Sequence, residues 1–185
     1  IIYALMNYLS DPPYIEKSLT FSKQSDEKVG VSDLSQDGKF TLITNNTSVC
    51  LWNNETQKLH LSCLLGVGKD YVEIVKIAKN NQYFVISNRV SVKVFSLVTG
   101  KLIGEWSLKD HIINDIALSK DAKVILLGFR SGKVSIINPF TKVMATYQKH
   151  KLDINSVSLS DNGMYAFTGA SDKTAIHWNT QAGKN

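Results

Sequence analysis

Histidine and carboxylate side chains carry most of the acid–base and metal chemistry of proteins, and this 185-residue chain has four histidines. A structural zinc site needs about four ligands at close spacing, and a catalytic zinc site needs about three. The histidines are instead separated by 27 to 51 residues and fall on strand-like or repeated positions, namely His60, His111, His150 and His177. We therefore expect no metal centre.

Other reactive patterns are missing from the sequence. It contains no G-x-S-x-G, no G-x-x-x-x-G-K-[ST], no H-E-x-x-H and no Cys-x-x-Cys motif. Asp37 and Asp121 each stand alone in a short turn, whereas calcium takes about six to eight oxygen ligands. Cys50 and Cys63 lie on consecutive expected strands, so two packed thiols and a cross-strand disulfide both stay open. We expect a non-catalytic protein without a cofactor.

Composition and charge favour an ordinary globular β-protein. The chain is 43% apolar and 20% charged, and Val, Ile, Thr and Ser are abundant. Its formal net charge of +5 is mildly basic, but Lys and Arg are scattered among Asp and Glu. Nucleic-acid binding typically needs clustered basic residues, so we interpret these charges as a solvated surface and expect no nucleic-acid partner.

Three kinds of residue recur along the chain with one period of 41 to 43 residues. A small residue closes a strand-like stretch at Ser35, Ala78, Ser119 and Ser160. A turn residue follows it at Asp37, Asn80, Asp121 and Asn162, and a large apolar residue ends a later stretch at Trp52, Phe95, Ile137 and Trp178. A period of about 40–45 residues with four short strands is typical of a β-propeller blade.

The strand pattern divides the chain into four units after a short N-terminal segment. The units span about residues 14–65, 66–108, 109–148 and 149–185. The first three are expected to form four-stranded antiparallel sheets and the last a three-stranded one, with tight hairpins such as Asp37-Gly38. Because one such sheet cannot bury both of its apolar faces, the sheets must pack against one another. The predicted fold is an all-β propeller.

Residues 1–13 form a separate segment, because Asp11-Pro12-Pro13 interrupts any regular element. Residues 1–10 are mostly apolar but too short to span a bilayer, which takes about 20 residues in a helix. Two interpretations stay open. The segment is the end of a secretory signal or membrane anchor, or it is a short helix or strand packed on the domain. Cytoplasmic and membrane-anchored extracytoplasmic locations both stay open with it.

Residues 150–179, with the sequence stretches SLSDNG and FTGASDKTAIHWN, resemble a repeat of the Trp-Asp (WD) repeat β-propeller family. The resemblance extends more loosely over about residues 14–185 and indicates a divergent, bacterial-type member. In that family a His, a Ser or Thr, an Asp and a Trp form a structural hydrogen-bonded tetrad. The resemblance assigns these roles to His150, Thr168, Asp172 and Trp178, with Ser171 competing with Thr168. The alternative is a catalytic dyad of His150 and Asp172.

The family resemblance also implies a ring of about seven blades, so the chain is expected to form part of a larger, incomplete ring. The last unit lacks an outer strand, and residues 14–22 form a spare strand that could pair with the edge at residues 174–178. Such pairing would close a small four-bladed ring, which lies within the range of about 4–8 blades. Otherwise the rest of the ring is either cut off from this sequence or supplied by another copy of the chain, so self-association stays open.

The leading functional hypothesis is a protein- or peptide-binding scaffold that presents loops on one propeller face. The turns after the second strands and the loops before the first strands should share that face, which would carry Arg89, Lys109, His111, Arg130 and Lys151. Such a face would suit an acidic or phosphorylated partner, unless these are ordinary solvated loop residues. Two alternatives are a propeller hydrolase or lyase whose catalytic residues lie outside this chain, and a membrane-tethered envelope-associated propeller.

Overall fold

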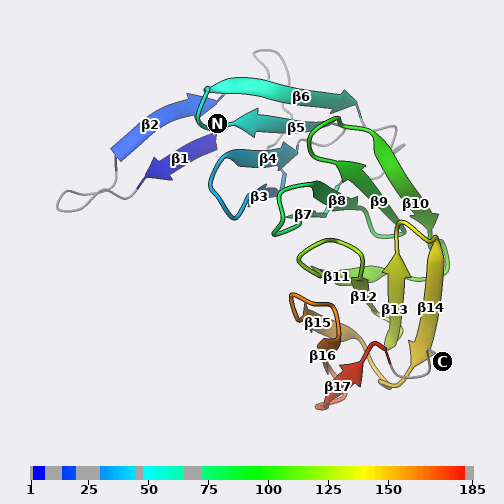
Figure 1. The fold of residues 1–185 in the computed structure, drawn as a ribbon. Helices are drawn as coiled ribbons and strands as arrows, with labels where there is room; N and C mark the ends of the chain where they lie inside the picture. Colours follow the sequence, from blue (N-terminus) through cyan, green and yellow to red (C-terminus); the bar gives the residue numbers. More distant parts are fainter. Residues whose placement is uncertain (1, 7–13, 20–29, 45–47, 65–71, 182–185) are drawn as a thin grey trace.

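The computed structural model is built from β-strands arranged along an arc, which confirms the all-β fold class (Figure 1). It describes residues 2–6, 14–19, 30–44, 48–64 and 72–181, and no helix occurs among them. The sheets follow one another along the arc in chain order, and each is antiparallel throughout. They have the form expected of propeller blades, but the arc does not close into a ring.

Three sheets have four strands, as expected. The first contains β3 (Ser32–Leu34), β4 (Phe40–Thr44), β5 (Ser48–Asn53) and β6 (Lys58–Leu64). The second contains β7 (Ile74–Ile77), β8 (Tyr83–Ser87), β9 (Ser91–Ser96) and β10 (Leu102–Ser107). The third contains β11 (Ile113–Leu118), β12 (Ile125–Phe129), β13 (Lys133–Asn138) and β14 (Val143–Gln148). The fourth has three strands, β15 (Ile154–Leu159), β16 (Tyr165–Ala170) and β17 (Ala175–Asn179).

The remaining two strands, β1 (Ile2–Met6) and β2 (Tyr14–Leu19), pair with each other. The hypothesis that residues 14–22 close a four-bladed ring is therefore not realised here, because β2 bonds to β1 and not to β17. Because β2 pairs with β1, it also does not join the sheet of the first expected unit. Within the described part of the chain, no helix has the length and apolar character needed to cross a membrane.

A recurring turn joins the first and second strands of each sheet. In the first sheet, Asp37 Oδ1 accepts hydrogen bonds from Ser35 Oγ at 2.7 Å and from the Lys39 amide at 3.0 Å. Gly38 then adopts a φ of 73°, which glycine tolerates without strain. Equivalent side-chain bonds join Ser119 to Asp121 and Ser160 to Asn162. These local contacts explain why the turn residues mark the repeat.

The hydrophobic core lies between successive sheets. Seven residues after each small marker residue, Leu42, Val85 and Leu126 lie at equivalent places on the second strand, and each is at most 1% exposed. Leu42 and Val85 each belong to a cluster with residues of the next sheet, and Leu126 packs with Ile154 and Ala166 of the fourth sheet. Each of the first three sheets therefore buries one face against its successor, as a propeller requires.

The first strands of the sheets, β3, β7, β11 and β15, lie side by side on the inner side of the arc (Figure 1). Two aspartates join them across the gaps between sheets. Asp33 Oδ2 accepts from the Ile77 amide at 2.6 Å, and Asp115 Oδ2 accepts from the Val157 amide at 2.8 Å. These amides lie on strand edges without a ladder partner, so each carboxylate satisfies a donor that sheet formation leaves open.

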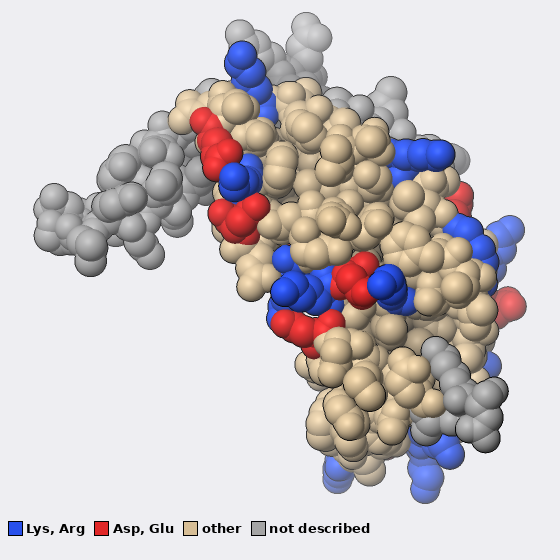
Figure 2. All heavy atoms as spheres, viewed as in Figure 1, with Lys and Arg blue, Asp and Glu red and all other residues tan. Residues whose placement is uncertain are grey.

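Acidic and basic side chains lie next to one another along the inner side of the arc in the view of Figure 2. One cross-sheet pair of this kind joins Lys79 Nζ to Asp161 Oδ1 at 2.5 Å. The mixture of signs agrees with the interpretation of the surface charge as solvated.

The two cysteines lie on the paired strands β5 and β6 but are not register partners. Cys50 lies opposite Ser62, and Cys63 lies opposite Val49.

Candidate functional site

His150 lies at the centre of a hydrogen-bonded network in the fourth sheet. It comes shortly before β15 and is only 1% exposed. Its Nε2 lies 2.8 Å from Oγ1 of Thr168 on β16, and its Nδ1 lies 3.2 Å from Oδ2 of Asp172 in the following turn. Trp178 on β17 donates its indole N–H to Thr168 Oγ1 at 2.9 Å. The structure thus brings together the four residues that the resemblance assigns to the tetrad.

Thr174 is a fifth member of this network, which the sequence interpretation missed. Its hydroxyl donates to Asp172 Oδ1 at 2.6 Å and lies 2.9 Å from His150 Nδ1. Since its proton points to the carboxylate, the Thr174 oxygen accepts from the Nδ1–H group. Nε2 then accepts from the Thr168 hydroxyl, whose oxygen accepts from Trp178. A single neutral imidazole tautomer satisfies all of these bonds.

Asp172 joins the loop before β15 to the β16–β17 turn by hydrogen bonds. Its Oδ2 accepts from the Lys151 amide at 2.8 Å, and its Oδ1 accepts from the Thr174 amide at 3.0 Å. The Thr174 hydroxyl, followed by the Lys151 amide, holds the pKa of the Asp172 carboxyl well below its usual value. The signal for Thr174 is a hydroxyl residue two positions after an aspartate, which is a common turn pattern.

Hydroxyl, imidazole and carboxylate follow one another here in the order of a catalytic triad. A nucleophile must be open to a substrate, but Thr168 is 1% exposed and its oxygen already accepts the indole N–H. The arrangement can hold strands and turns in place but offers no accessible reacting group. This geometry does not favour a catalytic dyad of His150 and Asp172.

Ser171, the competing choice for the hydroxyl position, lies outside the network. Its hydroxyl exchanges hydrogen bonds with the side chain of Asn155, at 3.0 and 3.2 Å.

The third sheet replaces the network with apolar contacts. The His111 ring packs against Phe129, with ring centroids 5.2 Å apart. Leu127 occupies the place of Thr168, 41 residues earlier and at the same register to the first strand of its sheet, and it is fully buried. Ile137 stands in place of the tryptophan and is fully buried. This sheet is therefore held by packing alone at these positions.

Loops of successive sheets contact one another on the side of the molecule where the inner strands begin. The Ile113 amide, at the start of β11, donates to the carbonyl of Arg89 in the β8–β9 turn at 2.8 Å. Asn114 Nδ2 donates to the carbonyl of Ile154, at the start of β15, at 3.0 Å. We call this side the loop face. It contains the β8–β9, β12–β13 and β16–β17 turns and the loops before β11 and β15.

A pair of side chains repeats on the loop face, always 16 residues apart. One member comes just before or at the start of the inner strand, and the other opens the turn after the second strand. The pairs are Glu73 with Arg89, Asn114 with Arg130, and Asn155 with Ser171. The distances are 2.7 Å from Arg89 Nε to Glu73 Oε1 and 3.0 Å from Arg130 Nε to Asn114 Oδ1. Sequence reasoning found the arginines but not their partners.

The other expected members of the partner-binding face lie in the two loops that precede β11 and β15. Lys109 and Lys151 are exposed. His111 is half-buried against Phe129, so its ring is less available to a partner. Four of the expected members are therefore exposed cations, namely Arg89, Lys109, Arg130 and Lys151, and the exposed Lys149 and Lys173 lie in the same loops.

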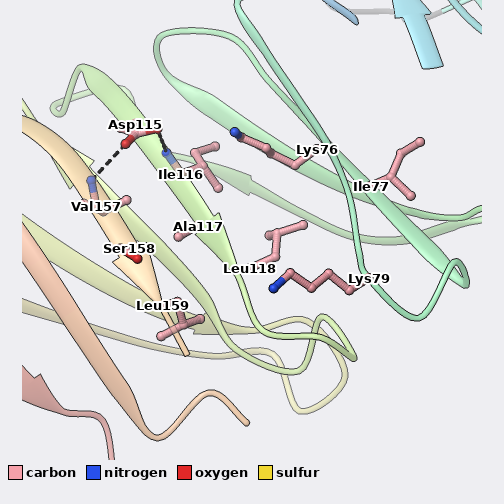
Figure 3. Close-up of a pocket in the computed structure, with 10 residues that line it drawn as sticks. All are labelled: Lys76, Ile77, Lys79, Asp115, Ile116, Ala117, Leu118, Val157, Ser158 and Leu159. Carbon is pink, nitrogen blue, oxygen red and sulfur yellow. Dashed lines mark hydrogen bonds between the residues drawn. The ribbon is translucent and has the colours of Figure 1, made fainter. Parts of the chain in front are cut away.

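A shallow cleft of about 260 Å³ lies between the inner strands β7, β11 and β15 (Figure 3). Lys76, Asp115, Ala117 and Ser158 are among the residues that line it. The Asp115 carboxylate accepts from the Val157 amide at 2.8 Å and from the Ile116 amide at 2.8 Å (Figure 3). It is therefore engaged with the backbone rather than directed at a ligand. Among the described residues, no group of three or more His, Cys, Asp or Glu is placed to hold a metal ion.

Comparison with known families matched residues 141–179 to the family model described as WD domain, G-beta repeat. The match includes β14, the last strand of the third sheet, and all three strands of the fourth sheet. It contains every member of the His150 network. No curated protein matched the sequence.

Proposed function

We propose that this chain, a WD-repeat protein whose matched repeat spans residues 141–179, is a non-catalytic scaffold that binds a protein or peptide on its loop face. The observation that carries the proposal is that turns and loops from successive sheets contact one another on one side of the molecule. The bonds from Ile113 to Arg89 and from Asn114 to Ile154 hold these loops on rigid strands. Loops positioned by a rigid scaffold are the usual place for binding residues.

The charge of the loop face supports an acidic partner. Its exposed cations are separated along the chain but lie in the turns and loops that make up the loop face. Only Arg89 among them pairs with a carboxylate within the described residues, namely Glu73. The others can therefore bind carboxylate or phosphate groups of a partner through charge-assisted hydrogen bonds.

A non-catalytic role is supported by the state of the one histidine–carboxylate pair in the described residues. His150 and Asp172 are joined to the surrounding turns and strands by hydrogen bonds, and the Thr168 hydroxyl beside them is buried. WD-repeat domains are generally used for protein interaction, which agrees with this assignment.

The test measures binding of a fluorescent, short alternating Gly–Glu peptide by anisotropy. We expect binding that weakens as salt rises, and a loss of about tenfold or more when Lys109 and Lys151 are both changed to Glu. The matched control is Lys58→Glu with Lys101→Glu, two exposed lysines that lie outside the loop face. Equal binding by the two double variants would contradict the proposal.

We propose in addition that the fourth sheet associates with a second copy of the chain. Phe167 lies at the place equivalent to Leu42, Val85 and Leu126, yet it is 54% exposed while those three are buried. Its ring contacts His177, which in turn stacks with Tyr165, so three rings lie together on this face. In the three preceding sheets the same face packs against a neighbouring sheet, and an apolar face of another copy would cover it in the same way.

A further inference from the structure

The repeated pairs of the loop face differ in one respect that bears on recognition. Arg89 and Arg130 occupy equivalent turn positions, and each donates its Nε–H to a side chain 16 residues earlier. For Arg89 the acceptor is the carboxylate of Glu73, whereas for Arg130 it is the neutral amide of Asn114. The first arginine is thus neutralised within the chain and the second is not.

Arg130 keeps its positive charge uncompensated. Among the described residues no carboxylate lies within ion-pair distance of its guanidinium, and the residue is exposed. Only Nε is engaged by Asn114, so both terminal nitrogens remain for another group. The terminal nitrogens of a guanidinium match the two oxygens of a carboxylate or phosphate in a bidentate pair.

Arg130 is also held in place before a partner arrives. The Asn114 amide can be oriented in one way only, because its Nδ2 donates to the Ile154 carbonyl and its Oδ1 accepts from Arg130. The backbone of Arg130 is fixed as well, since its amide donates to the Ile112 carbonyl at 2.9 Å. A side chain fixed in this way loses less conformational freedom on binding than a free surface arginine does.

We propose that Arg130 is the oxyanion-recognition residue of the loop face, and that Asn114 positions its guanidinium to bind a carboxylate or phosphate side chain of a peptide. Arg89 does not take this role, because the Glu73 carboxylate already compensates its positive charge. The proposal rests on the proposed binding function of the loop face and names the residue that decides its ligand chemistry. Lys109 and Lys151 add attraction without a fixed geometry.

The experiment compares matched substitutions in the two equivalent pairs, with the same Gly–Glu peptide as the probe. We expect Arg130→Lys, which keeps the charge but not the bidentate geometry, to weaken binding about tenfold. Arg89→Lys should change it less than twofold. Asn114→Asp should also weaken binding, because it would provide Arg130 with an internal carboxylate like that of Glu73. Glu73→Gln should strengthen binding, because it releases Arg89.

Two further arms separate the sources of the oxyanion. A Gly–Gln peptide should not bind, and comparison of the Gly–Glu peptide with a Gly–phosphoserine peptide shows which oxyanion is preferred. Thermal unfolding of every variant checks that the fold is retained, and Asn114→Ala gives a second test of positioning without a new charge. If Arg130→Lys binds as tightly as the unchanged chain while the Lys109 and Lys151 double variant loses binding, this inference is wrong and the binding function stands. If neither changes binding, both fail.

Discussion

The indole N–H of Trp178 donates to the hydroxyl oxygen of Thr168 across 2.9 Å, and the same hydroxyl lies 2.8 Å from His150 Nε2. Thr168 therefore connects the third strand of the sheet to the loop before the first strand. A buried hydroxyl with two partners is costly to remove, because both partners lose a bond that water cannot replace.

We expect Thr168→Val, which keeps the shape of the side chain, to lower the free energy of unfolding by about 3 kcal/mol. The loss arises because the buried His150 Nε2 and Trp178 Nε1 groups would be left without partners. Urea denaturation measures it, and Ser171→Ala, in the exposed turn after the same strand, should change the value by less than about 0.5 kcal/mol. Equal effects of the two substitutions would show that the network does not stabilise the sheet.

Asp172 should make stability depend on pH in the acid range. Its pKa is lowered in the folded protein, so its contribution is present above the ordinary carboxyl pKa of about 4 and is lost as the pH falls below that value. The unfolding midpoint of the unchanged chain should therefore fall on acidification more steeply than that of Asp172→Asn. The two midpoints should be furthest apart at neutral pH and approach each other toward pH 2.

Asp110→Asn, a substitution in an exposed loop, provides the control. Its unfolding midpoint should depend on pH in the same way as that of the unchanged chain. A difference in unfolding midpoint between Asp172→Asn and the unchanged chain that stays constant at all pH values would contradict the role of the ionised carboxylate.

Two glycines with almost the same backbone angle should respond differently to alanine. Gly38 has a φ of 73° and nothing within 4 Å of an added Cβ atom, so Gly38→Ala should cost only the backbone strain, about 1 kcal/mol. Gly132 has a φ of 75°, but an added Cβ would meet the carbonyl oxygens of His150 and, at 2.8 Å, of Leu152. Because backbone atoms cannot move aside, Gly132→Ala should cost clearly more. Parallel urea titrations measure both, and a larger loss for Gly38→Ala would contradict the packing of the β12–β13 turn.

Equivalent residues on successive sheets should differ according to whether a neighbouring sheet covers them. We expect Leu126→Ala to lower the free energy of unfolding by about 3 kcal/mol, because it leaves a cavity between the third and fourth sheets. Phe167→Ala should cost less than about 1 kcal/mol, because its side chain is half-exposed.

Phe167→Glu should in addition abolish the proposed self-association, which sedimentation equilibrium measures across a range of protein concentrations. A chain that stays monomeric throughout that range would contradict the proposal, and so would an assembly that Phe167→Glu leaves intact.

Much of the blade architecture could be predicted because the signals for it are local. Ser35, Asp37 and Gly38 form their turn from contacts within a few residues, so the recurrence of the small residue and the turn residue every 41 to 43 residues helped to identify the repeat. The bacterial type, the unit boundaries and the location in the cell stay predictions.

The amino-acid sequence by itself determined the β-period, the tight turns and the residue types at the places of His150, Thr168, Asp172 and Trp178, because strand alternation and turn conformation depend on near neighbours. Only the tertiary structure decided that β2 pairs with β1, that Thr174 joins the His150 network, and that Glu73 neutralises Arg89 while Asn114 leaves Arg130 charged. It also decided that Phe167 lies open where its equivalents are buried. These outcomes depend on which side chains and sheet faces meet in space, and the spacing of residues along the chain does not encode that directly.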